Sequence, residues 1–312
     1  MDFENNIGSN NTQTTRTIFD DCICVEISFK RFGIKKKVAK GKVKTDANEK
    51  YVRTTKDIID SGAYDRIVKF DNETRDIVSR YAVPSILREG SWLVKIESFE
   101  ALNRQLEDRA SRRRELVDAF VDIEYRPQIE AMRAELGSLW DARNYPPAEK
   151  VRDLFDMIVR FTSYSTPQQL ARLNPEVYAK AVSQARAEIA SATDEIRDMM
   201  RAAMADLVDH LVDRLERKQD GSQKIFRDTL IDNVREFIDT FGARNIVDDE
   251  ALAALVQRAR GILDNQGLQI DAQSLRDSNV LSDRVRSGFA ELKASLDEML
   301  VDRPKRKINF DL

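Results

Sequence analysis

The chain has 312 residues, of which 42% are hydrophobic and 34% are charged, and its net charge at pH 7 is −3. It has enough apolar residues to bury one large core or two ordinary ones. Its 11 glycines and 7 prolines are few, which favours long helices over many short strands. Residues 30–44 carry eight basic side chains and no acidic one, so the rest of the chain carries −11. This uneven distribution excludes a uniformly basic polyanion binder.

The N-terminus lacks a basic stretch followed by an apolar run, and no apolar stretch approaches the roughly 20 residues that span a bilayer. We therefore expect a cytoplasmic protein without a signal peptide or a membrane span. Cys22 and Cys24 are the two cysteines, and a disulfide between positions so close together would close a very tight ring. We expect both to be free thiols in a reducing compartment.

The first hundred residues contain most of the predicted strands. Residues 1–17 are polar and aperiodic, which predicts a disordered tail. Residues 18–30 alternate between an apolar face and a more polar face, which predicts a half-buried strand. Gly33 allows a turn, and the lysine-rich alternation of residues 34–40 then predicts an edge strand. A further alternation over 92–96 predicts a third strand.

Helix signals begin at Thr45, which is a good cap, and they predict a helix over 45–59 that ends at Ser61-Gly62. A second helix is predicted over 64–81, before Pro84.

From Ser98 the pattern is helical for the rest of the chain. Pro127 is expected to kink or break the first of these helices, and Pro147 is expected to open a helix that reaches about Phe161. The charged turn over 107–115 is expected to face water.

The longest predicted element is a nearly continuous helix over 174–217, about 63 Å long at ~1.5 Å per residue. It begins with Asn174 as its cap and Pro175 in its first turn. Its apolar residues recur every three or four positions, close to the heptad repeat of a coiled coil, so we expect this stripe to be buried against an antiparallel partner. Further helices are predicted near 223–241, 248–265 and 281–301.

These elements predict a mostly α fold, in which a small N-terminal β element packs on a long antiparallel helical bundle. The expected organisation is a disordered tail (1–17), a small α+β region (18–96), an elongated helical bundle (97–302) and a C-terminal tail (303–312). The alternation over 305–310 predicts that this tail adds a strand to the N-terminal sheet.

The sequence shows no catalytic or cofactor motif. His210 is the single histidine and lies among apolar residues of the predicted long helix, and zinc would need more ligands than Cys22, Cys24 and His210 supply. Gly41-Lys42 lacks the other residues of a phosphate-binding loop, and the acidic run over 248–250 lies at a helix start, where it serves as a cap. We therefore expect no enzyme, no cofactor and no metal site.

The basic segment is the sharpest candidate site. On a pair of strands its side chains would form a stripe that meets nucleic-acid phosphates, with Phe29 and Phe32 between them. The alternative is a solvated edge strand, where lysine is common. Shorter basic runs lie at 112–114 and 305–307. The candidate nucleic-acid-binding residues are Lys30, Arg31, Lys35, Lys36, Lys37, Lys40, Lys42 and Lys44.

Six stretches carry a resemblance to a known family, namely residues 27–37, 145–147, 205–214, 226–230, 236–241 and 303–306. Over about residues 20–310 the chain resembles a bacterial and phage family whose domain has no assigned function. Genes of that family lie in mobile elements, near MoxR- or cobalt-chelatase-like AAA+ ATPases and von Willebrand A proteins. The resemblance implies a cofactor-free component of an ATPase-linked assembly, and it implies no catalytic residues.

We therefore expect a non-enzymatic adaptor or scaffold subunit of a phage or mobile-element system. Its expected partners are proteins, such as an AAA+ ATPase, a von Willebrand A protein or further copies of the chain. The alternative is a nucleic-acid-binding accessory factor for DNA metabolism that uses residues 30–44.

Overall fold

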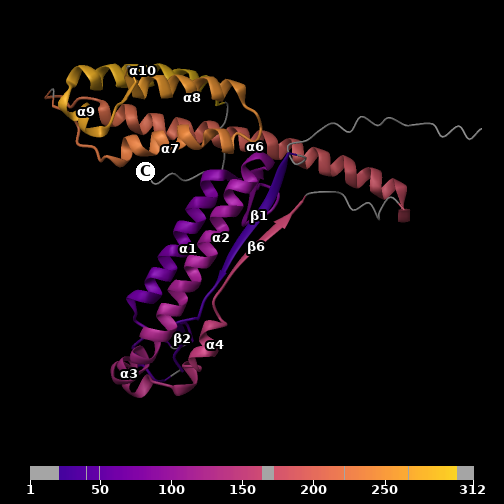
Figure 1. Cartoon of the computed structure of the whole chain (residues 1–312), viewed down its shortest axis with the longest axis vertical. Helices are drawn as coiled ribbons and strands as arrows, with labels where there is room; N and C mark the ends of the chain where they lie inside the picture. Colours follow the sequence, from indigo (N-terminus) through magenta and orange to yellow (C-terminus); the bar gives the residue numbers. More distant parts are fainter. Residues whose placement is uncertain are drawn as a thin grey trace, which may run out of the picture.

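The computed structural model describes residues 21–39, 41–48, 50–163, 172–220, 222–265 and 267–300. The chain is mostly helical with a small antiparallel sheet, as predicted. Two elongated parts meet at an angle (Figure 1), and we call them the arm (residues 21–163) and the bundle (residues 172–300). The predicted disordered tail (1–17) and the predicted added strand in the tail (303–312) lie outside the described residues.

The larger sheet lies in the arm. Within the described residues it contains β1 (Cys22–Lys30), β4 (Ala82–Pro84), β5 (Ser91–Lys95) and β6 (Asp156–Thr162), in the order β4-β5-β1-β6. All neighbours are antiparallel, and Val25 of β1 lies opposite Trp92 on one side and Phe161 on the other. The strands predicted over 18–30 and 92–96 are confirmed.

β1 differs from its prediction because it is buried on both faces over its first half. Val25 faces a core formed with the arm helices, and it is fully buried. Cys22 and Cys24 lie on the opposite face and pack into the core of the bundle. A free cysteine behaves as a small hydrophobic residue. The face of β1 that was predicted to be the more polar one is therefore apolar where it meets the bundle.

Two long helices cover one face of the sheet. α1 (Gly62–Tyr81) and α2 (Ile96–Ala119) lie side by side (Figure 1) and bury Val78, Leu102 and Leu106 against β1. The helix predicted over 64–81 is confirmed. Ser61, predicted to stop a helix, instead begins one, because its hydroxyl accepts hydrogen bonds from the amides of Ala63 and Tyr64.

The helix predicted over 45–59 is wrong. β2 (Lys35–Lys37) and β3 (Thr55–Asp57) form a two-stranded antiparallel ribbon, and residues 38–54 connect them. Thr45 does accept a hydrogen bond from the amide of Ala47, so the local turn signal was correct. A helix is stabilised mainly by burying an apolar face, and residues 45–57 hold too few apolar side chains to form one.

α2 continues through a π-helical turn (Phe120–Glu124) into α3 (Tyr125–Leu136). Pro127 lies inside this continuous helix, where it has no N–H to donate and where its ring would clash with the carbonyl of residue 123 in a regular α-helix. The π-helical turn relieves that clash, so Pro127 distorts the helix instead of breaking it. Gly137 ends α3 with φ of 47° and is followed by 3-10 turns at Gly137–Leu139 and Ala142–Asn144.

The helix predicted from Pro147 to Phe161 is also wrong. α4 (Ala148–Arg152) is only one turn long, and the chain then enters β6. Residues 157–162 are rich in β-branched and aromatic side chains, and pairing with β1 overrides the helical interpretation. Contacts therefore cross the predicted division at residues 96 and 97, since β6 pairs with β1 and α1 packs on α2.

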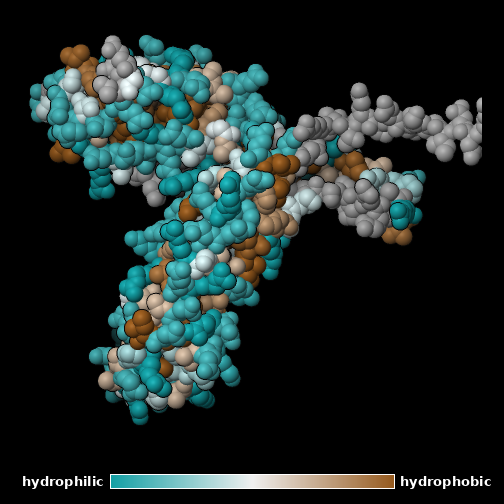
Figure 2. All heavy atoms as spheres, in the orientation of Figure 1, coloured by the Kyte–Doolittle hydropathy of each residue, from teal (hydrophilic) through white to brown (hydrophobic). Residues whose placement is uncertain are grey.

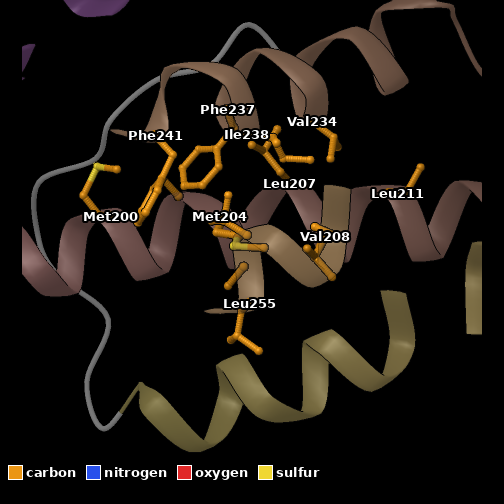
Figure 3. Packing of buried hydrophobic residues seen from close by; sticks show 14 of the residues in the cluster. Met200, Met204, Leu207, Val208, Leu211, Val234, Phe237, Ile238, Phe241 and Leu255 are labelled. Atoms are coloured by element: carbon orange, nitrogen blue, oxygen red, sulfur yellow. The ribbon is translucent and has the colours of Figure 1, made fainter. Parts of the chain in front are cut away.

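The bundle is formed by helices. They are α6 (Pro175–Leu215), α7 (Thr229–Arg244), α8 (Glu250–Leu263), α9 (Ala272–Asp277) and α10 (Asn279–Met299). A short hairpin of β7 (Asp264–Asn265) and β8 (Leu268–Gln269) follows α8. In Figure 3, Phe237 and Phe241 of α7 lie against the methionines of α6. The helices predicted near 223–241, 248–265 and 281–301 are confirmed as α7, α8 and α10, although α7 begins six residues later than predicted. The short helix α9 was not predicted.

The predicted long helix is confirmed as α6, and the Asn174 side chain caps it by accepting from the amides of residues 176 and 177. α10 runs antiparallel to it, because Arg201 bonds to the carbonyl of Met299 while Arg217 pairs with Asp283. The prediction of a stripe buried along its whole length is wrong: the buried residues of α6 begin at Ala192. The part before that residue projects beyond the bundle (Figure 1).

Candidate functional site

Two surfaces stand out, and the first is the ribbon at the far end of the arm. We call residues 35–57 the basic hairpin. In its register Lys36 lies opposite Lys56 and Lys37 lies opposite Thr55. Alternation therefore places Lys36 and Lys56 on one face, which turns toward the protein. The Lys36 ammonium lies 5.6 Å from the centre of the Phe32 ring, and the Lys56 ammonium donates to the carbonyl of Leu139.

The first two cations of the predicted site are also engaged. Lys30 lies 3.9 Å from the carboxylate of Asp156, and Arg31 lies 3.1 Å from the carboxylate of Asp71. Of these pairs the second is the more constrained, because the Asp71 side chain is fully buried. Lys40 lies outside the described residues.

Four of the eight predicted residues remain exposed without an ion pair to a described residue. They are Lys35, Lys37, Lys42 and Lys44. Two cations that the sequence interpretation missed, Lys50 and Arg53, lie exposed on the same hairpin. Lys50 lies 5.5 Å from the ring centre of Tyr51, which is 77% exposed. Both were missed because residues 45–59 were assigned to a helix, although their basic character was visible in the sequence.

The base of the hairpin is held by a buried charge cluster. Arg113 of α2 donates to both carboxylate oxygens of Asp71 on α1, at 2.7 and 3.2 Å, and to the carbonyl of Lys30 at 2.9 Å. Arg31 binds the same carboxylate, so one buried anion ties β1 to both arm helices. The expectation that the charged turn over 107–115 faces water is therefore wrong at Arg113, which is 3% exposed.

The basic run over 112–114 forms no patch. Arg112 is exposed but pairs with Asp108 one turn earlier, at 2.9 Å, and Arg113 is buried. Of the three, only Arg114 is exposed without an ion pair to a described residue. The run over 305–307 lies outside the described residues.

His210 and the two cysteines belong to different parts of the molecule. His210 is on α6 in a surface hollow lined by Arg214, Phe226 and Arg227, whereas Cys22 and Cys24 are at the junction of arm and bundle. Burial raises the pKa of Cys22 to about 12, more than the nearby Lys95 lowers it, so the thiol is protonated at neutral pH. Among the described residues no group of three or more His, Cys, Asp or Glu side chains is placed to hold a metal ion.

The acidic run over 248–250 is explained by capping, as predicted. Asp249 accepts a hydrogen bond from the amide of Leu252 at 3.1 Å and begins α8. Its carboxylate also binds Arg201 of α6, at 2.7 and 3.2 Å, so the cap joins two helices. Asp248 adopts a left-handed backbone conformation with φ of 48° and pairs with Lys95 of β5.

The second surface is the part of α6 that leaves the bundle. We call residues 175–191 the projecting helix, and none of them is buried. Tyr178, Val182, Ala185 and Ile189 follow one another at spacings of four, three and four. In the bundle the same rhythm continues through Ala192, Ile196 and Met199, which are buried. One apolar stripe therefore runs from the core of the bundle out onto the free end of the helix.

No family model, no curated protein and no solved structure matches the chain. In the part of the chain that the structure describes, no helix combines the length and the apolar character that crossing a membrane requires.

Proposed function

We propose that this chain is a non-enzymatic adaptor or scaffold subunit that acts through protein–protein contacts. The projecting helix is the observation that carries the proposal. Its apolar stripe has the spacing with which one helix packs on another, and Val177 beside it is 49% exposed. Burying an exposed Val, Leu, Ile, Phe or Met side chain completely contributes about 1.5–3 kcal/mol. Val182 and Ile189 are partly buried already, so each contributes less than this, and the stripe as a whole provides useful affinity.

The arrangement of the molecule supports the same proposal. The arm and the bundle point in different directions, and the projecting helix extends away from the arm and from the other helices of the bundle (Figure 1). Partners bound at these ends would be held apart, as a scaffold requires. The resemblance to a mobile-element family makes an AAA+ ATPase or a von Willebrand A protein the partner that we propose.

A pair of matched variants tests the adaptor function. Val182→Glu places a charge in the apolar stripe, whereas Ala187→Glu places the same charge on the opposite, exposed side of the helix. We expect a partner protein that co-purifies from nuclease-treated lysate of the native host to be lost with Val182→Glu and kept with Ala187→Glu. Equal binding by both variants, or partners that disappear with nuclease, would count against the proposal.

The basic hairpin favours a second candidate function, which is binding of nucleic acid. Residues 35–57 carry nine basic and three acidic side chains in a chain whose net charge is −3, and a ribbon of two strands fits the major groove of DNA. Affinity would come mainly from released counterions, with little base specificity, because Tyr51 is the one exposed aromatic ring on the described part of the hairpin.

Salt dependence and charge reversal test this second function. Four phosphate contacts predict a slope of about −3.6 for duplex DNA in a plot of log K against log salt, at roughly 0.9 per contact. Changing Lys35, Lys37, Lys42 and Lys44 to Glu should abolish binding in a fluorescence-anisotropy titration. The control changes four exposed lysines elsewhere (Lys69, Lys150, Lys180 and Lys218) to Glu, which gives the same net charge. If both quadruple variants lose binding equally, the hairpin is not the site.

A further inference from the structure

The two edges of the arm sheet differ in how they are protected. β4 forms one edge with three residues, ends at Pro84 and contacts α7 of the bundle. β6 forms the other edge with seven residues, and among the described residues no strand pairs with its outer side. It contains no proline and no lysine, the residues that commonly protect an edge from pairing.

β6 lies along the outside of the arm (Figure 1), and hydrophobic side chains gather along this side of the arm in Figure 2. Met157 and Val159 lie on the face that the helices cover, where they pack against the core around Val25. Asp156, Ile158 and Arg160 lie on the opposite face. The outer edge of β6 therefore presents backbone groups that pair with no described strand. One face beside this edge is apolar, and the other carries Asp156 and Arg160 on either side of Ile158.

Each charged residue on the open face of β6 lies opposite a residue of the other sign on β1. In the register of the sheet Glu26 lies opposite Arg160, Ser28 lies opposite Ile158, and Lys30 lies opposite Asp156. Lys30 and Asp156 are 3.9 Å apart. Along the open face of β6 the residues are therefore negative (Asp156), apolar (Ile158) and positive (Arg160). If a second β6 lies antiparallel to the first, its positive residue faces the negative residue of the first strand, and the two apolar residues face each other.

We propose that the outer edge of β6 pairs with β6 of a second copy of the chain, antiparallel and with Ile158 opposite Ile158 of the second copy. In this register Asp156 lies opposite Arg160 of the second copy, and Arg160 lies opposite its Asp156. Met157 lies opposite Val159 on the covered face. The two sheets then form one continuous sheet. Across the four central strands the charges alternate in sign, from Glu26 and Arg160 of one copy to Asp156 and Lys30 of the other.

A second copy fits this edge better than an unrelated strand because the match is specific to one symmetric register. Shifting the two-fold axis by one residue, to Val159, places Asp156 opposite Thr162 and Arg160 opposite Ile158, so neither charge has a partner. Opposite charges placed directly across a strand pair stabilise it. The pairing involves neither the projecting helix nor the basic hairpin. The proposed function and the pairing are therefore tested by different experiments, and one can fail without the other.

Sedimentation over low to high micromolar concentrations tests the pairing. We expect the wild type to shift from the 35.8 kDa of the monomer to twice that mass. Ile158→Lys sets two like charges face to face at the two-fold axis and should stay monomeric where the wild type is dimeric. Ser28→Lys is the matched control, since Ser28 is exposed and lies beside Ile158 on the same face but one strand inward, and it should dimerise as the wild type does.

Cysteine cross-linking tests the register. Opposite residues of an antiparallel pair lie close enough for a disulfide, so Ile158→Cys should form a covalent dimer under mild oxidation. Arg160→Cys should not, because residue 160 and its copy lie four residues apart along the strand, about 14 Å. Cys22 and Cys24 are buried and give no background.

Several results would overturn the proposal. They are a wild type that is monomeric at all concentrations, equal effects of Ile158→Lys and Ser28→Lys, or equal cross-linking at 158 and 160. A dimer that appears only after deletion of residues 303–312 would also overturn it, and would assign the edge to the C-terminal tail of the same chain.

Discussion

Asp71 lies at the centre of the buried charge cluster in the arm. It is fully buried, and it balances Arg113 and Arg31 while Arg113 also holds the carbonyl of Lys30. Removing one partner of a buried ion pair leaves the other charge uncompensated, which typically costs about 3–5 kcal/mol.

We therefore expect Asp71→Asn, which preserves the shape of the side chain, to lower the free energy of unfolding by about 3–5 kcal/mol in urea denaturation. The control is Asp108→Asn, which breaks the exposed pair with Arg112 and should cost less than about 1 kcal/mol. Equal, small effects of the two substitutions would show that the buried cluster contributes no more than a surface pair.

Asp249 predicts a dependence of stability on pH. Burial raises the pKa of its carboxyl, but the hydrogen bonds from Arg201 and from the amide of Leu252 outweigh burial, and the pKa lies below its ordinary 3.8. Because the folded-state pKa is lowered, the stabilisation is complete above about pH 4 and is lost as the pH falls through the folded-state pKa. Asp249→Asn should therefore be less stable than the wild type at pH 7, and the difference should shrink below about pH 4. A difference that does not vary with pH would contradict this assignment.

At the residue scale the sequence identified the cations but not their neighbours. The eight candidate residues were visible as a charge run, yet Lys30, Arg31 and Lys36 are engaged by Asp156, Asp71 and Phe32. Two of these partners lie 40 and 126 positions away from the cations they bind. The order of residues in the sequence carries no information on such pairings. The number of basic side chains that remain free to bind a phosphate could therefore not be predicted.

α6 shows how far an element can be read from its sequence. Its cap, first-turn proline and apolar rhythm are all local signals, and together they predicted both ends of the helix within a few residues. β6 gave the opposite result, because whether residues 156–162 form a strand is decided by their pairing with β1, more than 120 residues earlier. Long periodic helices are therefore predictable here, and short strands completed from distant sequence are not.

The two halves of α6 should respond differently to the same substitution. Leu211 is fully buried in the bundle, whereas Ile189 is half-buried where the helix leaves it. Leu211→Asp should lower the free energy of unfolding by roughly 4 kcal/mol or more, and Ile189→Asp by roughly 1–2 kcal/mol, because a charge at the second site still reaches water. Thermal or urea unfolding measures both values. If Ile189→Asp proves as damaging as Leu211→Asp, the stripe at Ile189 is covered in the free protein.

At the scale of the whole molecule, the angle between arm and bundle gives an extended particle (Figure 1). A compact chain of this length would have a radius of gyration of about 20 Å. We expect small-angle X-ray scattering of residues 21–300 to give a clearly larger value and a skewed distance distribution. A radius near the compact value would mean that the arm folds back on the bundle in solution.

Cys22 and Cys24 belong to strand β1 of the arm, but their side chains are buried in the core of the bundle. A thiol reagent can reach them only when the two parts separate, since Cys24 is 1% exposed. The rate of their modification under native conditions therefore reports how often that junction opens, in the same way that amide exchange reports local unfolding. The chain thus contains its own probe of movement between arm and bundle, and any partner that bridges the two parts will slow the labelling of both thiols.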